Sequence, residues 1–188
     1  MKVLLTHPGT QHSYQLAKQL HSKGILFRFH TGIAYGKDHW FYKLAAKLPA
    51  GIFKKISTRF IDGVPDVYVR RHFINEFIQI IGIKLGKDEE LSLFKRNNRF
   101  QKSIPEKEIQ ACDAVIGFDT SSAILIERCK QLSKPFILDV SIGHPASKDK
   151  VYKYLLQQYP DWHFTVKQKP DWYIRIEEQE MKTADSIV

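Results

Sequence analysis

The pattern of apolar and polar positions predicts alternating strands and helices. Residues 2–6 form a short apolar run that a Pro-Gly pair stops, which is typical of a buried parallel strand. Ser13 suits a helix N-cap, the apolar residues after it have helical spacing, and Gly24 ends the helix. A second strand is predicted over residues 25–31. We therefore expect a right-handed βαβ unit to open the fold.

The middle of the chain has a less regular pattern, in which aromatic and basic residues mix. We expect helices over 38–48 and around 53–60, followed by a strand over 67–70. Two further helices are expected near 73–84 and 89–102, and they carry more of the basic residues.

The second half returns to clear alternation. The predicted elements are strands over 113–118, 135–140 and 185–188, and helices over 121–131, 147–158 and 172–183. Alternating elements of this kind favour an α/β fold with a doubly wound, mostly parallel sheet flanked by helices. Because the last strand begins just as the sequence stops, we expect the chain to be a piece of a longer polypeptide.

Composition narrows the class of protein. A chain of 188 residues can bury a real core, and 43% hydrophobic residues exclude disorder and low complexity. The two cysteines belong to no C-x-x-C pair, so a disulfide framework and a structural zinc site are not expected. The apolar runs fall far short of the roughly 18 residues that a spanning helix needs, and the N-terminus has no signal-peptide pattern. We therefore expect a cytoplasmic protein.

Net charge points to the kind of partner. The chain has 29 Lys and Arg against 20 Asp and Glu, a formal charge of +9, which favours an anionic partner. Nucleic acid is not expected, because no known nucleic-acid-binding motif is present.

Three loops carry polar residues where such a sheet binds ligands, at the carboxyl ends of its strands. The first follows the opening strand, and its candidate substrate-binding residues are Gly9, Thr10, Gln11 and His12. One glycine allows close approach of the backbone, and the following helix N-terminus can attract an anion or a hydroxyl-rich sugar. The loop has neither the three-glycine dinucleotide pattern nor the P-loop lysine. A tight turn that only caps the helix is the alternative.

The other two loops offer carboxylates and a histidine. Asp119 follows the strand at 113–118, and capping alone explains the hydroxyl residues 120–122 after it. Asp139 ends the next strand, and His144 follows before a proline that fixes the turn. A histidine can transfer a proton near neutral pH, and a neighbouring carboxylate would hold its tautomer. The alternative for His144 is a surface or turn residue.

The basic and aromatic segment from 35 to 60 is a candidate membrane surface. If its aromatic residues share one helical face flanked by lysines, it would lie on an anionic bilayer with the apolar side inward. The candidate membrane-surface residues are Trp40, Phe41, Lys43, Lys47, Lys54 and Lys55. Alternatively, the basic face is solvated and the aromatic residues pack on the sheet.

Several of these features together resemble the N-terminal domain of a GT-B fold glycosyltransferase of the retaining family 4 group. They are the strand, glycine turn and helix that open the chain, the segments Gly117-Phe118-Asp119 and Gly143-His144-Pro145, and the closing segment 178–188 with its Glu and Ala-Asp before a strand. The resemblance implies that residues 1–188 form a Rossmann-like, acceptor-side domain, one half of a GT-B fold. It also implies that the C-terminal nucleotide-sugar domain is absent from this chain.

The same resemblance implies an activity. Such enzymes transfer a sugar from a nucleotide-sugar, here to a lipid-linked or envelope polysaccharide acceptor at the inner face of the plasma membrane, and this half alone would be inactive. Gly9 and Thr10 would lie near the donor diphosphate or the acceptor hydroxyl, and His144 would be the catalytic histidine that approaches the transferred sugar. No cofactor or metal ion is implied, and the sequence has no Asp-x-Asp motif. A non-catalytic α/β ligand-binding or interaction module is the alternative function.

Overall fold

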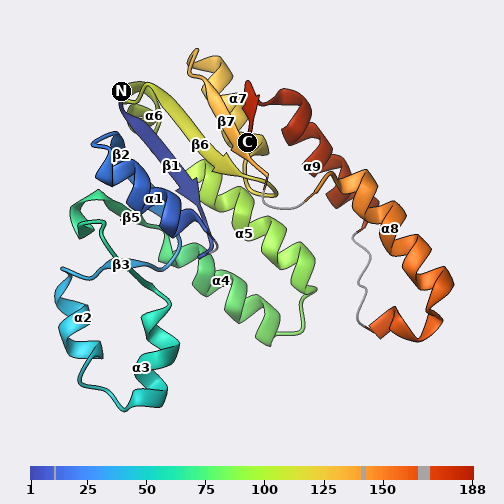
Figure 1. Ribbon diagram of the computed structural model, residues 1–188, viewed down its shortest axis with the longest axis horizontal. Coiled ribbons are helices and arrows are strands. Elements are labelled where there is room, and N and C mark those ends of the chain that lie inside the picture. Colours follow the sequence, from blue (N-terminus) through green and yellow to red (C-terminus); the bar gives the residue numbers. More distant parts are fainter. Residues whose placement is uncertain (11, 141–142, 165–169) are drawn as a thin grey trace.

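The computed structural model is an α/β fold built on one central parallel sheet (Figure 1). It describes residues 1–10, 12–140, 143–164 and 170–188. The six strands lie in the order β5-β2-β1-β6-β7-β8, and every neighbouring pair is parallel. The strands are β1 (Val3–His7), β2 (Leu26–Thr31), β5 (Val69–Arg71), β6 (Ala114–Phe118), β7 (Phe136–Asp139) and β8 (Ser186–Ile187). This is the doubly wound, Rossmann-like order, which confirms the predicted fold class.

Helices cover both faces of the sheet, and smaller elements extend from it (Figure 1). The α-helices are α1 (Ser13–Ser22), α2 (Trp40–Ala45), α3 (Ala50–Ser57), α4 (Phe73–Lys84), α5 (Glu89–Ser103), α6 (Glu106–Ala111), α7 (Ala123–Gln131), α8 (Pro145–Gln158) and α9 (Asp171–Thr183). The short helices η1 (Asp66–Tyr68) and η2 (Pro160–Phe164) and the two-stranded sheet of β3 (Tyr35–Gly36) and β4 (Phe60–Ile61) complete the fold. No helix among the described residues is long and apolar enough to cross a membrane.

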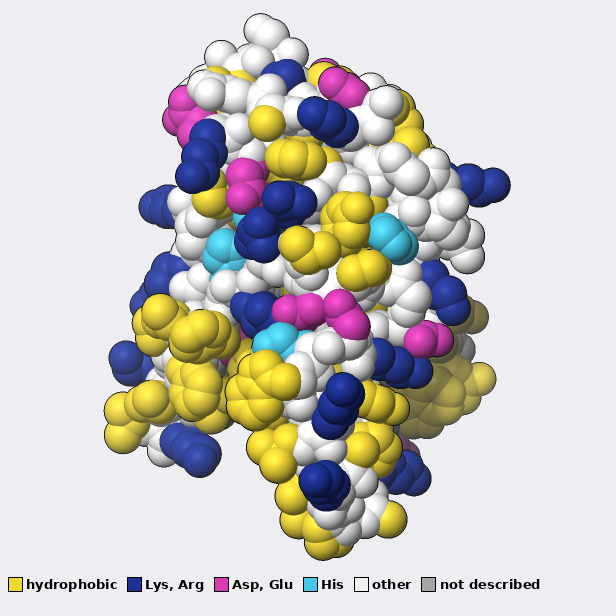
Figure 2. Space-filling view, turned by 90° about the vertical axis from the view of Figure 1, so that its left-hand side faces the viewer, with side chains coloured by type: hydrophobic (Ala, Val, Ile, Leu, Met, Phe, Trp, Pro, Cys, Tyr) yellow, Lys and Arg dark blue, Asp and Glu magenta, His cyan; other side chains and the backbone are white. Residues whose placement is uncertain are grey.

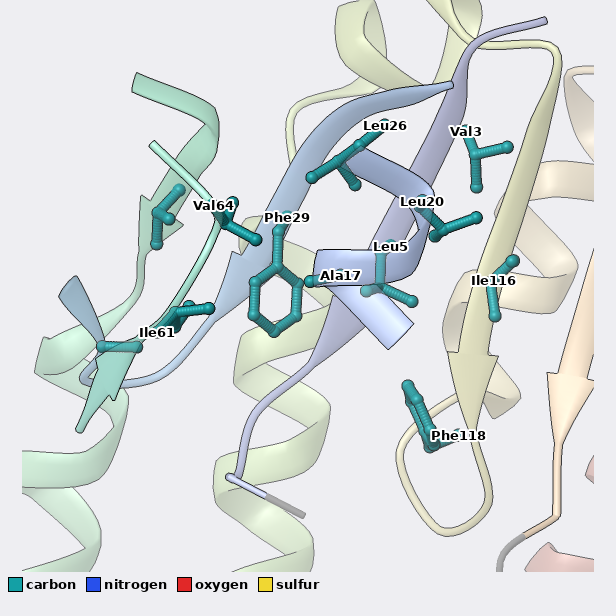
Figure 3. Packing of buried hydrophobic residues seen from close by; sticks show 12 residues of the cluster. Val3, Leu5, Ala17, Leu20, Leu26, Phe29, Ile61, Val64, Ile116 and Phe118 are labelled. Carbon is teal, nitrogen blue, oxygen red and sulfur yellow. The ribbon is translucent and has the colours of Figure 1, made fainter. Parts of the chain in front are cut away.

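The core has two halves because successive residues of a strand point to opposite faces of the sheet. Leu5 of β1 and Phe29 of β2 pack with Ala17 of α1 on one face (Figure 3). Leu4, the neighbour of Leu5, packs on the other face against residues of α5, α6 and α7. Both cysteines lie in this second half of the core as free thiols, as expected from their spacing.

Some predicted elements differ from the structure in their bounds, and one helix was not predicted. The helix expected over 53–60 ends at Ser57, because Phe60 pairs in β4 with Tyr35 of β3. The helix expected over 38–48 is shorter, spanning Trp40–Ala45. Helix α6 was not predicted, since six residues are too few to show helical periodicity. The expected final strand is present as β8 and pairs with β7.

Candidate functional site

The polar loops after β1 and β6 lie at the point where the strand order of the sheet reverses. Strands β1 and β6 are neighbours, but the chain continues from them to opposite sides of the sheet. The loops that follow them diverge, and open α/β sheets bind ligands in the crevice this leaves. Asp139 at the end of β7 joins this edge, where its carbonyl oxygen accepts a hydrogen bond of 3.1 Å from the backbone N–H of Asp119. The predicted ligand edge is therefore one continuous region.

His7, the last residue of β1, is a buried histidine at the base of this region. Its Nδ1 accepts a hydrogen bond of 3.1 Å from the backbone N–H of Gly9, and its ring lies edge-on to Phe118 at 4.7 Å. Burial lowers the pKa of His7 to about 4, so the ring is neutral at pH 7 and carries its proton on Nε2. The sequence analysis missed this residue, although a polar residue that ends an apolar strand could have indicated it.

Asp139 pairs with His12, whereas the sequence predicted that Asp139 would pair with His144. The Nε2 atom of His12 lies 3.2 Å from the Asp139 Oδ2 atom, and its ring lies 4.9 Å from the ring of Phe118. The His12 side chain is 43% exposed, so a ligand can reach it. The expectation that Asp139 would orient His144 is therefore wrong in this structure. His144 is exposed at the N-cap of α8, where its carbonyl accepts from the backbone N–H groups of Ser147 and Lys148.

Glu180 of α9 caps the N-terminus of α7, which corrects a second expectation. Its carboxylate accepts hydrogen bonds from the backbone N–H groups of Thr120, Ser122 and Ala123 at 2.6, 2.7 and 2.8 Å. The hydroxyls of Ser121 and Ser122 donate instead to the carbonyl of Phe118, so they do not cap the helix as predicted. Burial raises the pKa of Glu180 to about 7. A carboxylate of the chain itself thus fills one of the two anion-attracting helix ends in this region.

The loop after β6 also holds a strained residue. Thr120 has φ 70°, in the left-handed region that non-glycine residues seldom adopt. Its carbonyl accepts a hydrogen bond of 2.9 Å from the Asn97 side chain, and its N–H is held by Glu180. Arg96, beside Asn97, donates to the Asn97 side chain and is close enough to help lower the pKa of His7 after the larger effect of burial. Sequence reasoning did not place this cation near the loops, because it comes from α5.

The remaining loop residues lie mostly where the sequence predicted them. Gly9 is half-buried, and its carbonyl accepts from the Thr31 hydroxyl at 3.4 Å. Thr10 is half-buried, and its carbonyl accepts from the Ser13 hydroxyl. The prediction that Ser13 is the N-cap is wrong by one residue, because α1 begins at Ser13 and His12 is its N-cap. Gln11 lies outside the described residues. The Asp119 side chain is buried at the end of β6.

The candidate membrane-surface residues lie on α2, on α3 and, for Lys47, between these helices, apart from the polar loops in the sequence. Trp40 is exposed, whereas Phe41 is half-buried and packs near the rings of Tyr35 and Phe60. Phe41 therefore packs beside the small sheet of β3 and β4, whereas Trp40 is left exposed. Lys43, Lys47 and Lys54 are exposed, and the side chain of Lys55 lies outside the described residues.

A second polar cluster, which the sequence analysis did not predict, joins β2 to α5 and α6. His30 Nε2 lies 2.6 Å from Glu108 Oε2, His30 Nδ1 lies 2.8 Å from His72 Nε2, and His72 Nδ1 lies 2.7 Å from Ser103 Oγ. Burial lowers the pKa of both imidazoles, that of His72 to about 4. With both rings neutral, His30 donates to the carboxylate of Glu108 and accepts from His72. This cluster is an internal hydrogen-bond chain.

In the part of the chain that the structure describes, no three His, Cys, Asp or Glu side chains gather as a metal ion would require. Comparison of the chain with protein-family models, curated proteins and solved structures gave no match. The fold and the residues at the edge of the sheet are therefore the basis for assigning a function.

Proposed function

We propose that the chain is the acceptor-side domain of a glycosyltransferase of the GT-B type, which uses a nucleotide-sugar donor. The observation that carries the proposal is the His12–Asp139 pair at the switch point of the sheet, with a neutral His7 nearby. Paired imidazole and carboxylate groups suit the binding of sugar hydroxyls, because together they accept and donate hydrogen bonds. Their position at the carboxyl ends of parallel strands is where such folds bind ligands.

The two helix N-termini of this region, those of α1 and α7, would have different roles. The N-terminus of α7 is filled by Glu180, so a donor diphosphate would have to approach the loop before α1. Gly9 and Thr10 lie in that loop, as the resemblance to family 4 enzymes requires. Arg96 adds positive charge close to His7. His12 and Asp139 would hold the acceptor hydroxyl, and Asp119 would support the same region.

His144 remains the proposed catalytic residue. It is exposed at the N-cap of α8, in the loop region that follows β7. From there its imidazole would approach the transferred sugar and contact the transition state. The acceptor would be lipid-linked or an envelope polysaccharide, and the enzyme would work at the cytoplasmic face of an anionic membrane, which the net charge of +9 favours.

The test uses the product of the native gene, including whatever follows Val188. It is incubated with membranes and, in turn, with radiolabelled UDP-, GDP- and ADP-sugars, and labelled lipid or polysaccharide is counted. We expect transfer from one donor class and a loss of turnover of about 100-fold in His144→Ala. Unchanged turnover would remove His144 from the mechanism. Absence of transfer from every donor, together with binding of a nucleotide or sugar, would favour the non-catalytic module.

A further inference from the structure

Helix α4 has its polar side turned to the protein and its apolar side turned outward. Glu76 and Gly82 are buried, and the helix packs on α5. Ile74 is 62% exposed and Leu85, just after the helix, is 73% exposed. The exposed apolar face consists of Phe73, Ile74, Phe77, Ile78, Ile80, Ile81, Ile83 and Leu85. This reverses the usual arrangement of an amphipathic helix on a water-soluble domain, where the apolar face points to the core.

Contacts of Glu76 fix this orientation. Glu76 Oε1 accepts hydrogen bonds from Arg59 Nη1 at 3.3 Å and from the backbone N–H of Ile33 at 3.4 Å. A Cβ atom added to Gly32 would collide with the same Oε1 atom, which shows how closely α4 approaches the end of β2. Rotating α4 to bury its isoleucines would leave the Glu76 carboxylate and Arg59 without these partners. The outward apolar face is therefore built into the fold.

Two cavities flank the helix and differ in character. On the side of α2 and α3, a mostly apolar groove of about 540 Å³ is lined by aromatic and aliphatic side chains, including Phe41, Phe73 and Phe77, and by Arg59. On the side of α5, a cavity of about 220 Å³ is lined by Lys87, Lys95 and Arg99. Asp88 also lines this cavity, where its carboxylate accepts from the backbone N–H of Leu91. An apolar face thus adjoins a cationic cavity.

Figure 2 shows one face of the molecule, where hydrophobic side chains gather over the lower part with Lys and Arg side chains between them. Residues of α2 and α3 extend this surface, since Trp40 and Ile52 are 67% and 49% exposed. Contiguous apolar patches of this kind mark interaction surfaces. The nearby cations indicate that the partner is both apolar and anionic.

We propose that α4 lies in the surface of an anionic lipid bilayer, with its isoleucine and phenylalanine side chains among the acyl chains and lipid phosphates at Lys87, Lys95 and Arg99. Twelve residues are too few to span a bilayer but suit a helix in the interface. A second copy of the chain fits less well, because two molecules of charge +9 would bring like charges together. The proposal makes α4, rather than α2, the principal lipid-contacting element, and it does not depend on sugar transfer.

The experiment is co-sedimentation of the 188-residue chain with vesicles of phosphatidylcholine alone or mixed with phosphatidylglycerol, without any sugar donor. Ile81→Gln removes an apolar side chain from the α4 face, and Val151→Gln, at a similarly exposed position of α8, is the matched control. We expect binding to anionic vesicles to fall about tenfold in Ile81→Gln and less than about twofold in Val151→Gln. Lys95→Gln should reduce the preference for phosphatidylglycerol while retaining the melting temperature.

Three outcomes would overturn the proposal. They are an absence of wild-type binding to both vesicles, equal binding by Ile81→Gln and wild type, and a lipid-free dimer that Ile81→Gln dissociates in light scattering. The dimer would assign this face to a second copy. Circular dichroism and thermal melting show that each variant is folded. Failure here leaves the sugar-transfer test unaffected, because neither test uses the readout of the other.

Discussion

The Oε1 atom of Glu180 accepts a hydrogen bond of 2.7 Å from the backbone N–H of Ser122, which places a carboxylate from α9 at the N-terminus of α7. The closing segment makes a second such contact, because Asp185 Oδ2 accepts from the backbone N–H of Phe136 at 2.7 Å. Glu180 and Asp185 are two of the three acids of the closing segment 178–188. Both tie the end of the chain to the second half of the sheet, one at its ligand edge and one at the start of β7.

Glu180→Gln should change how stability depends on pH. Burial raises the Glu180 pKa from its ordinary 4.5 to about 7, so the folded state holds a proton that the unfolded state releases between these values. The stability this group contributes is full below about pH 4.5 and is lost as pH rises to about 7. At about 1.4 kcal/mol per pKa unit, wild type should lose about 3 kcal/mol relative to Glu180→Gln over this interval.

Urea unfolding at pH 5 and pH 8 measures this difference. Glu178→Gln, on the same helix but outside the cap, controls for the substitution itself. Because other groups also titrate in this range, the comparison is between variant and wild type at each pH. If the free energy of unfolding changes by the same amount between pH 5 and pH 8 in wild type and in Glu180→Gln, burial does not raise the pKa of this carboxyl.

Thr120→Asn should stabilise the fold. Thr120 and Ser133 are the non-glycine residues with positive φ among those described, at 70° and 51°. Asn tolerates this conformation better than a β-branched residue, so replacement at Thr120 should raise the free energy of unfolding by about 1 kcal/mol. Ser133→Asn should give a smaller gain of about 0.5 kcal/mol, as Ser is not β-branched. Thr58→Asn, at φ −63°, should give none. A loss at Thr120 in urea unfolding would mean that its side chain compensates for the strain.

His72 should remain neutral well below the usual range of histidine. Burial lowers its pKa from 6.5 to about 4, so the unfolded state binds a proton that the folded state does not take up until pH 4. The stability contributed by His72 is therefore full above about pH 6.5 and is lost as pH falls toward 4. Allowing for the partial exposure of the ring, wild type should lose about 2 kcal/mol relative to His72→Asn over this range.

The direct measurement for His72 is an NMR titration of the imidazole protons. We expect its midpoint to lie below pH 5, whereas a midpoint near 6.5 would contradict the prediction. His144→Asn, which alters an exposed imidazole at the N-cap of α8, is the control for the urea experiment. The slope of stability against pH should differ between wild type and His72→Asn but not between wild type and the control.

The sequence predicts the fold better than it predicts the contacts of the candidate site. Strands such as β1 are uniformly buried apolar runs, so local pattern is enough to find them. The sheet edge follows from topology, and Gly9, His12, Asp119 and Asp139 lie on it as expected. The pairing of Asp139 with His12 and the capping of α7 by Glu180 depend on residues far apart in the chain. The outward face of α4 was not predicted either, because its apolar positions have the spacing of a core helix.

The coupling between His12 and Asp139 can be tested in the native gene product if it transfers sugar. His12→Ala and Asp139→Asn should each lower kcat/KM by at least about tenfold, and the double variant should lose little more than either single variant, because the pair acts as a unit. His144→Ala combined with Asp139→Asn should instead lose the product of the two single effects, since Asp139 contacts His12. Multiplicative losses for His12 and Asp139, with strong coupling between His144 and Asp139, would show that the carboxylate turns to His144 in the working enzyme. Thermal melting of each variant separates these effects from unfolding.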